Sequence, residues 1–198
     1  MKRTVYIVCE GASEKAYISE VVKYFRDVED IDLHLIPKDV GTGYYSAVRD
    51  KYRDVFNSER KSPDIRIWVD KDIYLRNDGN NGDNYARRHE DGLPDFLFSF
   101  MNGEDFFAMH DEGFERWENI CHRKKHFSMP MHENACLPLL KENIFHNYRK
   151  GELPFEICLE RLKCLFRNQD KNRGKSNAIH CDFADFLKEV LEKAGVTL

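Results

Sequence analysis

Short apolar runs and stretches of helical periodicity alternate along the first 70 residues of the chain. Residues 4–9 (TVYIVC) form an apolar run, which is typical of a strand buried on both faces. In residues 13–26, apolar side chains recur every three or four positions, which predicts a helix. A strand, a helix and a strand are predicted next, at 31–36, 45–56 and 65–69. This order predicts parallel strands joined by right-handed crossovers, and therefore an α/β sheet covered by helices.

The pattern changes after the third predicted strand. Residues 77–84, rich in Asn, Gly and Asp, predict a solvated connection without the ligand spacing of a calcium loop. A helix is predicted at 93–101, a fourth strand at 106–109 and a final helix at 183–193. We therefore expect two parts: an α/β core at 1–117 with a mainly parallel sheet of about four strands, and a helical C-terminal extension at 118–198 packed on it.

Composition narrows the class of protein. Charged residues make up 33% of the 198 residues, and the net charge of −4 argues against a non-specific basic coat on nucleic acid, although a local basic groove is allowed. No apolar run approaches the roughly 18 residues of a membrane span, so we expect a soluble, cytoplasmic protein with no membrane partner. The six cysteines lack the density of a disulfide scaffold. Cys121, His126, His132 and Cys136 are zinc-type residues, but their spacing matches no compact zinc module.

Acidic residues follow three of the predicted strands. The fourth predicted strand leads into residues 110–115 (HDEGFE). The first strand leads into Glu10-Gly11, with Glu14 in the next helical turn, and the third leads into Asp70 and Asp72. Side chains at positions i and i+2 of an extended segment point the same way, so the two aspartates would repel unless a cation lies between them. Mg²⁺ accepts such carboxylates together with phosphate oxygens. Turn and helix-cap roles remain an equally common explanation for two such aspartates.

These residues resemble the Toprim domain, in the compact stand-alone form of RloB-like proteins and OLD-type nucleases. The similarity lies in Val8–Tyr17 (VCEGASEKAY) and Val69–Asp72 (VDKD), which match an acid-glycine turn and a D-x-D motif. Asp111–Trp117 (DEGFERW) is similar to the family's later Asn-Glu-x-Phe-Glu-x-Trp motif, with Asp in place of Asn, and makes Glu115 the late acid. A weaker match at 128–133 would place Glu133 there instead, but no predicted strand leads into it. The three motifs span residues 4–117.

The resemblance implies a nuclease that hydrolyses phosphodiester bonds of RNA or DNA with Mg²⁺ or Mn²⁺, in this branch usually in bacterial defence against phage. The ion would be held by Asp70, Asp72 and Glu14, with Glu115 completing its shell. Glu10 would act as general base or as ligand of a second metal, so that one and two ions both remain open. A metal held in this way polarises the phosphate and lowers the pKa of a bound water.

A phosphodiester substrate also needs contacts outside the metal site. Gly11 permits close approach of a phosphate to the backbone, and basic residues cluster at three places, 87–89, 122–126 and 167–175. Candidate nucleic-acid contacts are Gly11, Lys71, Arg123, Lys124, Lys125, Lys171, Arg173 and Lys175. A solvated charged face is an equally good explanation of each basic cluster. The histidines at 110, 122, 126, 132 and 180 match no position of the family's motifs, so we expect them at the surface.

Two other functions remain open. A glycosyltransferase could use Asp70 and Asp72 to hold a metal and a sugar nucleotide, but it gives no role to Glu10-Gly11. The protein could instead be a non-catalytic Toprim subunit that works with the ATPase of a defence system. Acids at all three predicted strand ends argue against this, because a site that has lost its activity is free to lose them. The nuclease itself could also depend on a partner ATPase or a phage trigger, and could be a homodimer.

Overall fold

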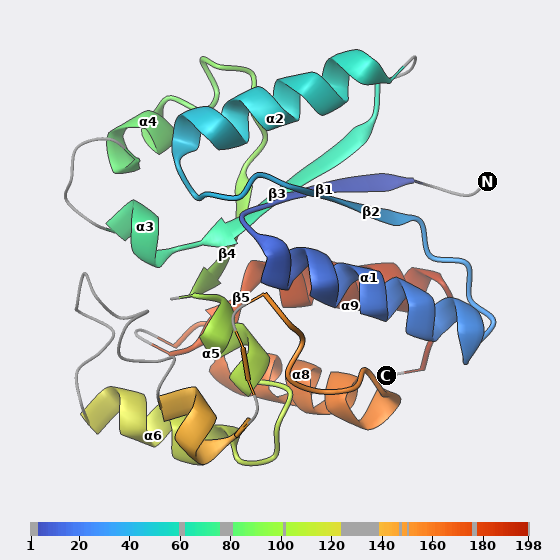
Figure 1. The fold of residues 1–198 in the computed structure, drawn as a ribbon, viewed down its shortest axis with the longest axis vertical. Coiled ribbons are helices and arrows are strands. Elements are labelled where there is room, and N and C mark those ends of the chain that lie inside the picture. Colours follow the sequence, from blue (N-terminus) through green and yellow to red (C-terminus); the bar gives the residue numbers. More distant parts are fainter. Residues whose placement is uncertain are drawn as a thin grey trace.

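Five strands form one sheet in the order β2-β1-β3-β4-β5 (Figure 1). The computed structural model describes residues 4–59, 62–75, 81–100, 102–123, 139–146, 148–149, 151–175 and 178–197. The strands are β1 (Val5–Cys9), β2 (Leu35–Asp39), β3 (Asp64–Asp70), β4 (Phe96–Phe100) and β5 (His180–Cys181). The first four are parallel and β5 is antiparallel to β4. The prediction of an α/β protein with a mainly parallel sheet flanked by helices is confirmed.

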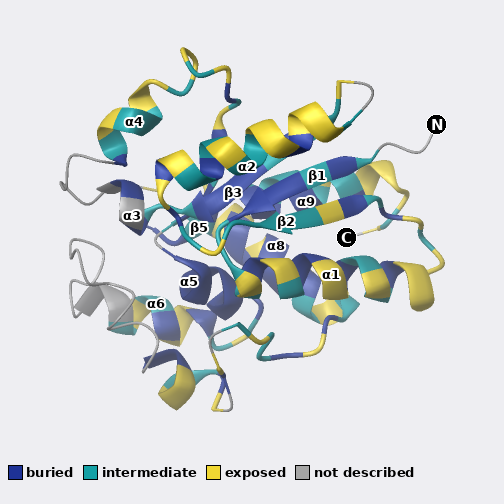
Figure 2. Ribbon diagram, turned by 45° about the horizontal axis from the view of Figure 1, so that its top comes forward, coloured by how far each residue is buried: buried dark blue, intermediate teal, exposed yellow. Residues whose placement is uncertain are grey.

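Helices cover both faces of the sheet (Figure 1). One face carries α1 (Ala12–Asp27), α5 (Gly103–Ala108), α6 (Phe114–Arg123), α8 (Leu159–Asn172) and α9 (Asp182–Lys193). The other carries α2 (Tyr45–Ser58), α3 (Asp72–Leu75) and α4 (Gly82–Ala86). Figure 2 shows that α5 is buried along its length, whereas α1 and α2 each expose one side. Within the described ranges, no helix combines the length and the apolarity that a membrane crossing requires.

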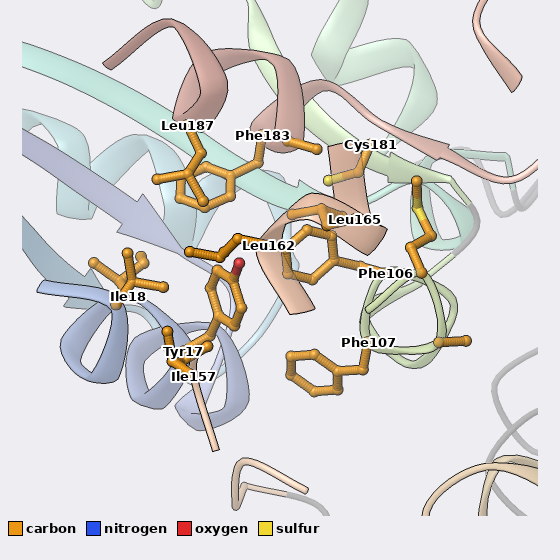
Figure 3. Packing of buried hydrophobic residues seen from close by; sticks show 14 of the residues in the cluster. Tyr17, Ile18, Phe106, Phe107, Ile157, Leu162, Leu165, Cys181, Phe183 and Leu187 are labelled. Atoms are coloured by element: carbon orange, nitrogen blue, oxygen red, sulfur yellow. The ribbon is translucent and has the colours of Figure 1, made fainter. Parts of the chain in front are cut away.

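The two hydrophobic clusters explain why the strands are apolar throughout. Alternate side chains of a strand face opposite sides of the sheet, so Ile7 packs under α1 and Val8 under α2. Trp68 of β3 faces the same side as Ile7 and stacks on Phe183 of α9, with ring centroids 4.0 Å apart. Figure 3 shows Phe183 among the surrounding side chains, including Tyr17 of α1. The core is therefore completed by a helix from the end of the chain.

Two predicted elements have the wrong type. The segment predicted as a helix at 93–101 contains strand β4, and the segment predicted as a strand at 106–109 lies in α5 and the turn after it. Both are short apolar runs surrounded by the core, where period alone does not separate strand from helix. A capping signal marks the true helix start, because the Asn102 side chain accepts a hydrogen bond from Asp105 N–H (3.1 Å).

Two boundaries also differ from the prediction. The second strand, predicted at 31–36, runs from Leu35 to Asp39 and includes Pro37. Because β2 is an edge strand, it tolerates the missing N–H of proline. The C-terminal extension is not purely helical, since it contributes β5 to the sheet.

His110 lies in the core, not at the surface as predicted, and is 1% exposed. Its Nδ1 lies 3.0 Å from the carbonyl oxygen of Phe106 and its Nε2 lies 2.8 Å from the hydroxyl of Tyr17. Burial lowers the pKa of His110 to about 3, so the ring is neutral. The neutral ring donates from Nδ1 and accepts the Tyr17 O–H at Nε2.

His180 was also expected at the surface, and the cysteines were not expected to form a disulfide scaffold. His180 is half-buried and stacks on Phe100, with ring centroids 4.9 Å apart. The four cysteines whose side chains are described, Cys9, Cys158, Cys164 and Cys181, are free thiols, and three of them are buried. The side chains of residues 121 and 122, and residues 126, 132 and 136, lie outside the described part of the chain.

Candidate functional site

A cavity of about 410 Å³ opens where β1, β3 and β4 end. The turn into α1, the start of α3 and the start of α5 meet there, at one edge of the sheet (Figure 1). Ligands of parallel α/β sheets bind at this edge. Five lining residues are acidic, namely Glu10, Glu14, Asp70, Asp72 and Glu104, and the described lining residues include no lysine or arginine. The structure therefore brings four of the predicted site acids together and adds a fifth, Glu104.

Glu10 is fixed at the end of β1 by the neighbouring strand and loop. Its Oε2 accepts a hydrogen bond from the backbone N–H of Asp70 (3.1 Å). The loop that follows β2 is tied to it, because Gly41 N–H donates to the Glu10 carbonyl oxygen (2.9 Å). A Cβ at Gly43 would lie 2.7 Å from the Glu10 carboxyl carbon, closer than real contacts allow. A larger residue at position 43 would therefore require the Glu10 carboxylate to move.

Glu14 faces two ways from the first turn of α1. Its Oε2 accepts the Gly11 N–H (3.0 Å), which is the helix-capping role open to an acid at this position. Its Oε1 faces α5, where a Cβ on Gly103 would lie 2.9 Å from it. The same Cβ position lies 3.9 Å from Oδ1 of Asp70. Glu14 therefore caps its own helix and also presents an oxygen on the side where Asp70 lies.

Asp70 lies at the centre of the acidic cluster. Its Oδ1 is buried and has no hydrogen-bond partner among the described residues. Burial raises the pKa of Asp70 well above its ordinary value, and the negative charges of Glu10, Glu14, Asp72 and Glu104 raise it further. Without a cation, this carboxyl group holds a proton far more readily than an exposed aspartate does.

Asp72 and Glu104 complete the cluster from short helices. Asp72 is the first residue of α3 and is buried. Glu104, in the first turn of α5, is 4% exposed, and its Oε1 accepts a hydrogen bond from the Tyr148 hydroxyl (3.3 Å). Sequence reasoning missed Glu104 because it assigned the fourth strand to the wrong segment. Asn102, the N-cap of α5, was the available signal that a strand ends and a helix begins here.

These donors suit a hard divalent cation. Among the residues that the structure describes, no group of three or more His, Cys, Asp or Glu side chains is arranged so that it could hold a metal ion. The five acids of the cavity lining nevertheless offer carboxylate oxygens, one of them the buried Oδ1 of Asp70, which has no hydrogen-bond partner among the described residues. Oxygen donors of this kind fit Mg²⁺ or Mn²⁺ better than a thiolate-binding metal.

Glu115 does not lie at the cavity, and this corrects its expected place in the metal shell. It belongs to α6, its side chain is 75% exposed, and its Oε2 lies 3.8 Å from Lys171 Nζ. The two aromatic residues of the motif pack in the core, since Phe114 and Trp117 are buried and the Trp117 Nε1–H donates to Asp105 Oδ1 (3.0 Å). The alternative late acid, Glu133, lies outside the described residues. The acid that follows the fourth strand in space is Glu104.

The described basic candidates lie away from the cavity lining. Lys71 Nζ lies 4.7 Å from the ring centroid of Phe98, on the face covered by α2. Lys171 lies beside Glu115. Arg173 pairs with Asp170 and Asp185, and Lys175 is exposed. The Arg123 side chain, Lys124 and Lys125 lie outside the described part. Of the predicted nucleic-acid contacts, Gly11 alone lines the cavity among the residues described.

Comparison with known proteins does not assign the chain to a family. No protein-family model, curated protein or solved structure shows significant similarity to the chain. The Toprim resemblance remains a prediction from three motifs. The first two meet at the cavity and the third does not.

Proposed function

We propose that the protein is a nuclease of Toprim type that hydrolyses phosphodiester bonds with Mg²⁺ or Mn²⁺. The observation that carries the proposal is Oδ1 of Asp70, which is buried without a hydrogen-bond partner among the described residues. Four further carboxylates surround it and raise its pKa. A divalent cation would satisfy that oxygen and offset the repulsion.

The cavity allows the roles to be divided among its acids. Asp70, Asp72 and Glu14 would hold the ion, and Glu104 would take the part that the resemblance gave to Glu115. When bound, the ion polarises the phosphate and lowers the pKa of a bound water. Glu10 would accept the proton of the attacking water, because the Asp70 N–H orients its carboxylate toward a fixed position.

The backbone at the start of α1 would help to orient the substrate. Gly11 lines the cavity, so a phosphate can approach the main chain there without a side chain in the way. A role in defence against phage, with a partner ATPase, is part of the proposal and rests on the motif resemblance alone. A glycosyltransferase would use Asp70 and Asp72 but leaves three acids of the cavity without a task.

The test compares wild type with Asp70→Asn, which keeps the shape of the side chain and removes its charge. We expect wild type to bind Mn²⁺ in a calorimetric titration and to cleave RNA or nick plasmid DNA in its presence. Asp70→Asn should lose both properties, whereas Asp50→Asn, an equal charge change on exposed α2, should keep them. Metal binding with hydrolysis of a sugar nucleotide and no cleavage would favour the glycosyltransferase. Equal cleavage by wild type and Asp70→Asn would overturn the site assignment.

A further inference from the structure

The C-terminal extension supplies part of the cavity wall. Tyr148 and Gly151 line the cavity although they follow its last acid by more than 40 positions. Tyr148 is 2% exposed, and its hydroxyl donates to Oε1 of Glu104 (3.3 Å). Gly151 N–H donates to Oγ of Ser13 (2.8 Å). The extension is thus hydrogen-bonded to α5 and to α1.

These two contacts reach the helices that carry cavity acids. Ser13 is the neighbour of Glu14 in the first turn of α1, and Glu104 is in the first turn of α5. Tyr148 and Gly151 together therefore join the start of α5 to the start of α1 from one side of the cavity. The Tyr148 ring is held against Phe107, with ring centroids 6.0 Å apart and an edge-on geometry.

The phenol is a dependable donor in this position. A tyrosine hydroxyl has an ordinary pKa of about 10, so it carries its proton at neutral pH and can donate to a carboxylate. A hydrogen bond to a carboxylate is stronger than one between neutral groups, and it fixes the direction of the buried Glu104 side chain. Groups that orient metal ligands in this way commonly change metal affinity 10- to 100-fold when removed.

We propose that Tyr148 is a positioning residue that holds Glu104 in the metal-binding orientation, so that the extension completes a site built on the α/β core. This inference rests on the proposed function of the cavity. It also assigns a task to a residue that no motif in the sequence distinguishes.

The experiment removes one hydroxyl and keeps the ring. Tyr148→Phe is compared with Tyr45→Phe, because Tyr45 is also buried and also donates to a carboxylate, Oδ2 of Asp91 (2.7 Å), without lining the cavity. We expect Tyr148→Phe to weaken Mn²⁺ binding about tenfold or more in a calorimetric titration. Cleavage by this variant should fall at low Mn²⁺ and recover at saturating Mn²⁺. Tyr45→Phe should match wild type in both measurements.

The outcomes separate this inference from the proposed function. If wild type binds Mn²⁺, Asp70→Asn does not, and Tyr148→Phe binds as tightly as wild type, the role of Tyr148 is wrong and the proposed function stands. If wild type does not bind Mn²⁺, the proposed function fails and the inference fails with it. If Tyr148→Phe does not fold, Ser13→Ala is titrated instead, and an affinity equal to that of wild type overturns the inference.

Discussion

Replacing Asp70 with Asn should stabilise the metal-free protein while it destroys the site. The pKa of Asp70 is raised in the folded state above its ordinary value of 3.8, first by burial and then by the surrounding carboxylates. The folded state therefore binds the Asp70 proton more tightly than the unfolded state does. Consequently, the free energy of unfolding falls as the pH rises from about 3.8 through the folded pKa, and the full loss is present above it.

The size of the effect follows from the linkage relation. Each pKa unit by which folding raises Asp70 costs about 1.4 kcal/mol of stability at neutral pH. Asparagine cannot ionise, so Asp70→Asn recovers that cost. A bound ion acts in the opposite direction on wild type, because at 100 times its Kd it adds about 2.7 kcal/mol. For a chain of this length, 1 kcal/mol shifts the Tm by roughly 2–4 °C, so saturating Mg²⁺ should raise the wild-type Tm by about 5–11 °C.

Thermal unfolding at pH 7.5 with EDTA or with Mg²⁺ tests both effects. Without metal, Asp70→Asn should unfold at a higher temperature than wild type, and the difference should shrink as the pH is lowered toward 4. With Mg²⁺, the wild-type Tm should rise and that of Asp70→Asn should not. The reasoning is refuted if Asp70→Asn is the less stable protein in EDTA at pH 7.5, or if Mg²⁺ raises both Tm values equally.

Three further predictions, which use four substitutions, test other parts of the structure. Glu104→Gln should reduce Mn²⁺-dependent cleavage at least 100-fold, whereas Glu115→Gln should leave the cleavage rate within about twofold of wild type. If the cleavage assay shows the larger loss for Glu115→Gln, the motif-based assignment of Glu115 as the late acid is restored. Gly103→Ala should displace the Glu14 carboxylate and weaken Mn²⁺ binding in a titration, and unchanged affinity would show that Glu14 is not a ligand. His110 has a pKa lowered by burial to about 3, so protonation favours unfolding and stability falls as the pH drops below 6.5. His110→Gln should flatten that decline in urea-unfolding measurements between pH 4 and 6.5, and an unchanged slope would contradict a neutral buried imidazole.

The parallel half of the fold was predictable because its signals are local. The run at 4–9 and the helical spacing that follows it fix β1 and α1, and the acid-glycine turn between them falls at the sheet edge. The signal fails after β3, where β4 and residues 106–108 of α5 are both short, apolar and buried. Tertiary packing decides their type, since Phe96 faces the α2 side while α5 is surrounded by core residues.

The site residues could be predicted only where the preceding strand was predicted correctly. Glu10, Glu14, Asp70 and Asp72 could be inferred because each follows a correctly placed strand. Glu104 could not, because its strand was assigned to another segment. Tyr148 could not be predicted for a different reason. Its position at the cavity depends on how a segment distant in the sequence packs, and no local pattern indicates it.

The charges around the cavity support the proposal that its acids serve a ligand in addition to their contacts within the fold. Elsewhere in the described chain, many carboxylates pair with a lysine or an arginine, as where Lys188 Nζ lies 2.8 Å from Asp170 Oδ2. Lys15 follows Glu14 directly, yet its ammonium lies 2.8 Å from Asp39 Oδ1 at the surface. The described cavity lining contributes five carboxylates without lysine or arginine, and one buried oxygen of Asp70 lacks a hydrogen-bond partner within it. Such a cluster destabilises the metal-free fold, and the divalent cation proposed above would offset that cost.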